Sequence, residues 1–153
     1  MGVRNCGELG INLQKIINRL VANDDLVKLL YHESDNPLEG ISLTKEQKQK
    51  EIFEKLIKTV PSVGTKDTAK SVVVVYVQRA AKIPGNKEFK NVRILVDVIV
   101  PLTQWYIKDA NLRPFAILGK IQESLDDKTI NGLGRISGGD FELNFVTDDV
   151  ICY

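Results

Sequence analysis

The chain has 153 residues, 43% of them hydrophobic and 27% charged, and a formal net charge of +1 at pH 7. This length fits one domain spanning residues 1–153, which can bury about 68–70% of the surface that its unfolded chain exposes. The composition excludes an intrinsically disordered chain. The small net charge gives no overall attraction to nucleic acid or to an anionic membrane.

The lack of a signal-peptide pattern and the small number of cysteines both favour a soluble product made without a secretion signal. No basic segment followed by a long apolar segment stands at the N-terminus, as a signal peptide would require. The longest apolar run, Val72–Val77, is far shorter than the ~20 residues that cross a bilayer. Cys6 and Cys152 are better explained as two reduced thiols than as a disulfide, because two cysteines do not make a disulfide framework.

The N-terminal part is predicted to be helical after a short arm. Residues 1–8 contain two glycines and show little periodicity, so we expect a flexible arm. Apolar residues then recur at the spacing of one helix face over Leu13–Val21. Asn23 can cap a second helix, whose apolar face is Leu26–Leu30.

A loop and a third helix are expected next. Residues 31–43 are rich in the residue types that form turns. Thr44 and Gln47 have the spacing of a capping box, which predicts the start of a helix. The residues expected to dock this helix on the core are Ile52, Phe53, Leu56 and Ile57. Pro61 is expected to stop it, and residues 62–70 to form a polar loop.

Two apolar strands are predicted in the middle of the chain. Residues 71–79 form the most apolar segment, which suits a central strand buried on both faces. Residues 80–91 are expected to form a turn or a longer hairpin loop. Val92–Val100 then alternates with a period of two, and Pro101 ends the strand because it has no amide hydrogen to donate. The two strands are therefore expected to pair in antiparallel fashion.

A helix and short strands are predicted for the C-terminal part. Pro114 suits the first turn of a helix that runs to Leu125. The residues expected on its apolar stripe are Phe115, Leu118, Ile121, Gln122 and Leu125. A turn at 131–134, a short strand at 135–137 and a strand at Phe141–Val146 follow. The fold class is therefore predicted to be α+β, with a mostly antiparallel sheet of about four to five strands flanked by helices.

No residue pattern in the sequence marks an active site. His32 is the sole histidine and has no cluster of ligands in the sequence around it. The glycines at 132 and 134 lead into a predicted strand, whereas a dinucleotide-binding loop leads into a helix. We therefore expect no catalytic residue, no cofactor, no metal and no enzymatic activity. A small enzyme with a site around Gly132–Asp140 remains the alternative.

The segment Leu102–Arg113 is the best candidate for an interface. Its candidate residues are Trp105, Tyr106, Lys108, Asp109 and Arg113. Aromatic residues and arginine are enriched where proteins bind one another. Tyr106 favours an interface, whereas Trp105 is better explained as a plug for the end of the core. A nucleic-acid-binding module, based on Lys82, Lys87 and Lys90, is a weaker hypothesis.

Several structural motifs together carry a family resemblance. An apolar strand ends at Pro101, Trp105 follows, and the run Asn111–Ile117 opens the next helix. The further motifs are the helix at Leu26–Leu30, the loop segment Asn36–Leu38, the turn Ile130–Gly134 and the segment Gly139–Phe141. This pattern resembles the tail terminator and head–tail joining (neck) proteins of long-tailed bacteriophages.

The resemblance implies a sheet flanked by helices that assembles as a homo-oligomeric ring, usually six-fold, at the head-proximal end of the tail tube. Such a ring stops tube polymerisation and joins the tail to the neck. The implied partners are therefore the tail tube protein and the neck or connector proteins, with no membrane and no specific nucleic acid, although DNA passes through such rings. The resemblance implies a virion location after assembly in the host cytoplasm. Another neck or head-completion (connector) protein is the alternative.

Overall fold

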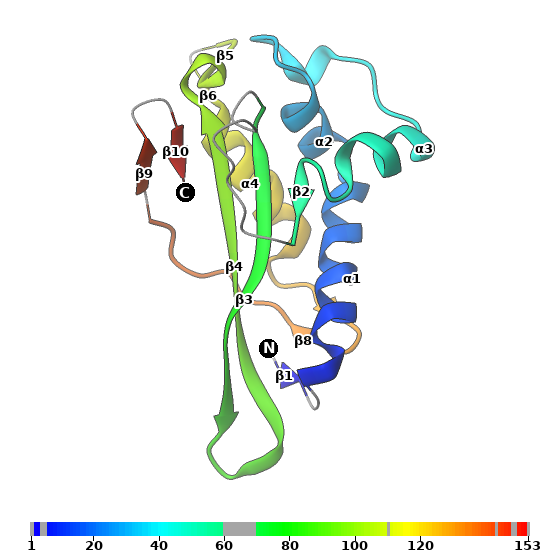
Figure 1. Cartoon of the computed structure of the whole chain (residues 1–153), viewed down its shortest axis with the longest axis vertical. Helices are drawn as coiled ribbons and strands as arrows, with labels where there is room; N and C mark the ends of the chain where they lie inside the picture. Colours follow the sequence, from blue (N-terminus) through cyan, green and yellow to red (C-terminus); the bar gives the residue numbers. More distant parts are fainter. Residues whose placement is uncertain are drawn as a thin grey trace.

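The computed structural model describes residues 2–3, 6–59, 70–109, 111–142, 144–147 and 150–152 (Figure 1). Helices lie beside and behind a twisted sheet in this view, and a long β-hairpin extends below them. The predicted α+β class is confirmed. The side chains of Cys6 and Cys152 are not described, and the expected polar loop at 62–70 lies outside the described residues except for Lys70.

The main sheet is mostly antiparallel, as predicted, and has six strands within the described residues. They are β1 (Gly2–Val3), β2 (Ile57–Lys58), β3 (Val72–Ile83), β4 (Asn86–Pro101), β9 (Asn144–Thr147) and β10 (Val150–Cys152), with β2-β3-β4-β10-β9 as the order and β1 pairing with β4. Among the strand pairs of the described residues, β2 and β3 alone run parallel. The sequence predicts about four to five strands. The two shortest strands, β1 and β2, have two residues each and are too short to give a periodic signal.

Alternating β-branched residues place one face of the β3–β4 pair in the core. The fully buried residues of this face include Val73, Val75, Val98 and Val100. The helices α1 (Leu9–Ala22) and α4 (Arg113–Leu125) contact β3 and β4 respectively, and α2 (Asp24–Tyr31) packs against both helices. Asn23 caps α2 as predicted, because its Oδ1 accepts a hydrogen bond from the backbone N–H of Leu26 at 3.1 Å.

Polar contacts tie α1 to the C-terminal part of the chain. The side chain of Asn12 donates to the carbonyl of Gly132 at 3.2 Å, and Arg19 donates to the carbonyl of Ser124 at 2.7 Å. Gly132 belongs to the turn between β7 (Thr129–Ile130) and β8 (Gly134–Arg135). The first helix is thus held by residues more than 100 positions later in the chain.

The prediction for the third helix is wrong beyond its first turns. Thr44 and Gln47 do form both hydrogen bonds of the capping box. The elements that follow are α3 (Lys45–Gln47), a π-helical turn (Lys48–Ile52) and then β2. Glu54 has a φ of 57°, a left-handed conformation that ends any right-handed helix. Ile52 and Ile57 are buried as expected, although Ile57 reaches the core from a strand.

Both central strands are longer than predicted. The sequence predicts a loop over residues 80–91, whereas the ladder continues to Ile83 opposite Asn86. The turn is tight and includes Gly85, whose φ of 79° favours glycine. We call the segment Gln78–Arg93 the hairpin arm. It forms the long ribbon at the lower end of Figure 1.

The arm is also joined by the start of the chain. Residues 1–8 are expected to be flexible, but Gly2 and Val3 form β1 and pair with Asn91 and Lys90 of β4. Cys6–Glu8 then form a 3-10 turn. The backbone pairing therefore adds a third strand to part of the hairpin arm.

The last helix begins and ends close to its predicted bounds. Its buried apolar residues are Ile117, Ile121 and Leu125. Phe115 and Gln122, which the apolar stripe includes, are exposed instead. The stripe is displaced because Ile117, and not Phe115, faces the core.

The C-terminal strands are shorter than predicted. The short strand expected at 135–137 is present as β8, which ends at Arg135. The strand expected to start at Phe141 begins only at Asn144, and Phe141 is exposed outside it. Leu143 lies outside the described residues.

Candidate interface site

The segment between β4 and α4 forms a small projection beside the end of α2. Its elements are a 3-10 turn (Leu102–Gln104), β5 (Tyr106–Ile107) and β6 (Asn111–Leu112), which pair in antiparallel fashion. Asp109 lies between these strands with a φ of 66°, a conformation that aspartate tolerates better than most residues. The backbone N–H of Lys108 donates to the carbonyl of Asp35 at 2.6 Å. This bond fixes the projection to the loop that follows α2.

The two aromatic residues of the projection lie in different environments. Trp105 is partly buried and packs against the core. Tyr106 is 72% exposed, whereas the next residue, Ile107, is buried. Because successive side chains of a strand point to opposite faces, burial of Ile107 directs Tyr106 to solvent. The structure thus places Trp105 at the core and leaves Tyr106 available to a partner.

Arg113 does not reach the surface, contrary to its inclusion among the interface residues. Its side chain is fully buried at the first position of α4. The guanidinium donates to five backbone carbonyls, namely those of Gln104 (2.8 Å), Leu29 (2.7 Å), His32 (2.7 Å), Glu33 (3.4 Å) and Ser34. Burial lowers the pKa of Arg113, and the charge of Glu33 opposes this shift. Arg113 therefore connects three segments of the chain, and its buried side chain is not exposed to a partner.

The carbonyls that Arg113 binds explain why a buried cation is tolerated there. Leu29 and His32 lie at the C-terminal end of α2, where backbone carbonyls have no partner within the helix. This end also carries the negative pole of the helix dipole. A planar guanidinium can bind several carbonyls at once, which a lysine ammonium does less well.

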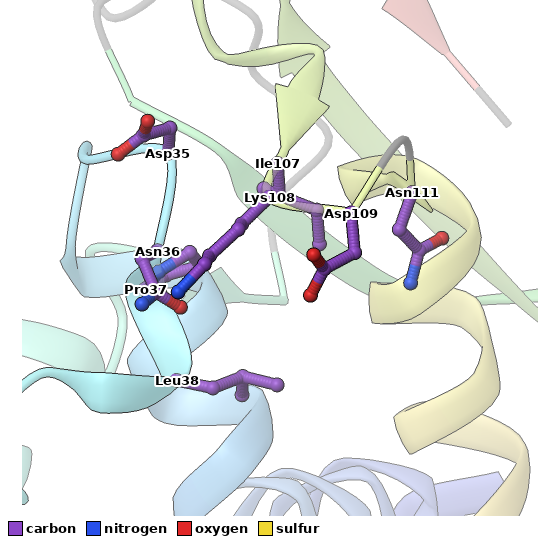
Figure 2. A pocket seen from close by; sticks show the side chains of 8 residues that line it. All are labelled: Asp35, Asn36, Pro37, Leu38, Ile107, Lys108, Asp109 and Asn111. Atoms are coloured by element: carbon purple, nitrogen blue, oxygen red, sulfur yellow. The ribbon is translucent and has the colours of Figure 1, made fainter.

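A cavity of about 430 Å³ lies between the projection and the loop after α2 (Figure 2). The residues that line it are Asp35, Asn36, Pro37, Leu38, Ile107, Lys108, Asp109 and Asn111. In Figure 2 the Lys108 side chain extends across the opening towards Asn36 and Pro37. Asp109 and Asn111 approach from the other side, and Leu38 lies below. The cavity is therefore lined mainly by polar and charged groups.

Charges at the rim of this cavity are exposed and weakly paired. Lys108 Nζ lies 3.6 Å from Oε1 of Glu39, the last residue of a 3-10 turn (Pro37–Glu39). A hydrogen bond from Asn36 lowers the pKa of Glu39, and the charge of Lys108 adds to this effect. Such an exposed ion pair contributes little to stability. These groups are thus available for new hydrogen bonds and ion pairs with a polar partner.

The structure brings only part of the predicted set together. Lys108 and Asp109 line the cavity, and Tyr106 lies in the same projection facing solvent. The sequence prediction missed the loop residues Asp35–Leu38, which are about 70 positions away in the chain. In the sequence these loop residues are marked by the Asn36-Pro37 pair, which predicts a turn. The pair does not indicate which other segment of the chain lies beside that turn.

Among the described residues, no three His, Cys, Asp or Glu side chains gather into a metal-ion site. In the same part of the chain, no helix combines the length and apolar character needed to span a membrane. Around Gly132–Asp140, Asp126 accepts a hydrogen bond from the backbone of Gly138, and Asp127 pairs with Arg135. These carboxylates hold the turn after α4 together.

Comparison with known proteins gives a family and no close relative. No curated protein and no solved structure matches the chain. The family model described as YomW matches residues 23–149, which include α2, the central strands, the projection and α4. The match covers most of the chain, so the protein belongs to the YomW family, a family derived from phage genes.

Proposed function

We propose that this protein is a structural component of a phage particle, a tail terminator that forms a ring at the head-proximal end of the tail tube. In this role it catalyses nothing. It binds copies of itself, the tail tube protein below and a neck or connector protein above. The YomW family supports the phage origin, and the neck-protein resemblance supports the position in the particle.

The observation that carries the proposal is the hairpin arm. Beyond the part that β1 joins, the arm is a two-stranded ribbon, and such a ribbon alone is marginally stable in water because it has little apolar surface to bury. The described residues of the arm are mostly exposed, and the arm extends beyond the helices in Figure 1. A long extension of this kind is stabilised when it packs on a neighbouring molecule. Closed rings provide such a neighbour for every subunit.

The projection supplies a second surface for assembly. Tyr106 is the most exposed aromatic residue among those described, and it lies beside the polar cavity that includes Lys108 and Asp109. In Figure 1, β5 and β6 lie at the end opposite the tip of the hairpin arm. A subunit with one binding surface at each end can contact a different neighbour through each of them.

Deleting the gene in the parent phage and imaging the lysate tests the proposal. We expect full heads and separate tails that fail to join, or tails of uncontrolled length. Normal particles at wild-type frequency would overturn the proposal. Tails that never form would place the protein earlier in assembly and overturn the tail-completion role. Heads that lose their DNA beside tails of normal length would identify a connector instead, which is the second candidate.

A further inference from the structure

Charge is strongly segregated between the hairpin arm and the rest of the chain. Residues 78–93 contain five of the 21 basic residues and one of the 20 acidic residues, a net charge of +4. The other residues, 16 basic and 19 acidic, carry a net charge of −3. The hairpin arm is therefore strongly basic, whereas the rest of the chain has a small acidic excess, so the arm can be attracted to an acidic site on a second copy of the chain.

Cations face each other across the two strands of the arm. Arg79 lies opposite Arg93, and Lys82 lies opposite Lys90. Because side chains alternate along a strand, the two pairs occupy opposite faces of the ribbon. Like charges placed directly opposite one another destabilise a sheet. Arg79 and Arg93 are exposed and form no ion pair with any described residue, so an anionic group on a partner can relieve their repulsion.

A surface of complementary chemistry lies at the first turn of α4. We call Phe115, Asp140, Phe141 and Glu142 the aromatic–acidic patch. Phe115 and Phe141 are 44% and 66% exposed, and their rings meet edge to face with centroids 6.4 Å apart. Asp140 and Glu142 flank Phe141 in sequence, are exposed and form no ion pair with the described part of the chain. Guanidinium groups stack on aromatic rings and bind carboxylates, so arginine suits this patch.

One subunit does not bring these two surfaces together. Arg93 lies on the face of β4 opposite Val98 and Val100, the fully buried residues on the helix side. Phe115 belongs to α4, which packs against β4 from the helix side. The arginines and the patch thus face different sides of the same sheet. Contact between them requires a second copy.

We propose that the hairpin arm of one copy docks on the aromatic–acidic patch of a second copy, with Arg79 and Arg93 against Phe141, Asp140 and Glu142. The contact joins two different surfaces, so it repeats from subunit to subunit and closes when the rotation allows. This inference rests on the proposed ring, because it names the surfaces that build it. It commits to a second copy because the chain itself carries the complementary charge.

Charge reversal tests the contact in the purified full-length protein by sedimentation velocity at low and high ionic strength. We expect wild-type protein to self-associate, and high salt to weaken the association. The double variants R79E/R93E and D140K/E142K should each associate at least about tenfold more weakly. The fourfold variant R79E/R93E/D140K/E142K exchanges the two signs and should recover association. Circular dichroism of every variant checks that it is folded.

The matched control is K45E/K50E, which makes the same change of charge on two exposed lysines of the α3 region. It should associate like wild type. If all three double variants associate like wild type, the docking contact is overturned while the ring proposal stands. If wild-type protein stays monomeric, the docking contact is likewise overturned. If a short DNA duplex binds wild type but not R79E/R93E, and association is unchanged, the arm binds nucleic acid and the inference is wrong. A deletion phage with normal particles would instead remove the proposed function, whatever the sedimentation shows.

Discussion

Replacing Arg113 by lysine should cost this subunit much of its stability, although the charge is kept. The guanidinium donates to five carbonyls from α2, the following loop and the 3-10 turn before β5. A lysine ammonium has three donors, so at least two carbonyls lose their partner. Each buried acceptor without a partner costs about 1–3 kcal/mol. We therefore expect Arg113→Lys to lose about 2–6 kcal/mol of unfolding free energy and on the order of 10 °C in Tm.

Urea denaturation followed by circular dichroism measures this loss. The matched control is Arg135→Lys, because Arg135 is exposed and its pair with Asp127 lies at the surface. That change should stay within about 0.5 kcal/mol. Both variants need the same protein concentration, since self-association adds to apparent stability. If Arg113→Lys unfolds at the same urea concentration as wild type, the five hydrogen bonds do not hold these segments together and the reasoning is refuted.

Three further predictions concern the helix cap, the sheet and the projection. Asn23→Ala removes the acceptor for the backbone N–H of Leu26 and the amide that donates to Ser124 Oγ at 2.9 Å. It should lower the unfolding free energy by about 1–2 kcal/mol in chemical denaturation. An unchanged denaturation midpoint would contradict the capping role. Burial raises the pKa of Asp97, and a hydrogen bond from Tyr76 opposes this only in part. The contribution of the protonated carboxyl is therefore present below about pH 4 and lost as pH rises through the raised pKa, so Asp97→Asn should become more stable than wild type as pH rises above about 4. A stability difference that does not change with pH would speak against this. Tyr106→Ala should leave Tm almost unchanged, because the side chain is 72% exposed. The same change should weaken self-association in sedimentation roughly tenfold, because an exposed aromatic side chain contributes much to an interface. Normal association would exclude Tyr106 from the interface.

The sequence predicted the elements whose signals are local. The spacing of apolar residues identified α1 and α2, the Asn23 cap and the capping box at Thr44. Pro101 and Pro114 marked the end of β4 and the first turn of α4, because proline lacks a donor in both positions. These features depend on residues a few positions apart, so they can be derived without the fold.

Features that depend on distant partners were missed. Residues 53–58 carry the apolar spacing of a helix, but pairing with β3 makes Ile57 and Lys58 a strand. The arm beyond Arg79 has low strand propensity by composition, and pairing across the hairpin overrides it. Arg113 was placed at an interface because arginine is common there, whereas its carbonyl partners lie about 80 residues earlier. The cavity lining was missed for the same reason.

The contacts that hold α1 also determine when this subunit can fold on the ribosome. Asn12 and Arg19 bind Gly132 and Ser124. These two partners leave the ribosome only after most of the chain has been made. Closing such long loops lowers the entropy of the chain before the stabilising contacts have formed, and this slows folding. Until then the apolar face of α1 stays exposed in the nascent chain, where it attracts other unfolded chains. Folding of the newly made chain is therefore expected to benefit from chaperones, even though the finished fold is small.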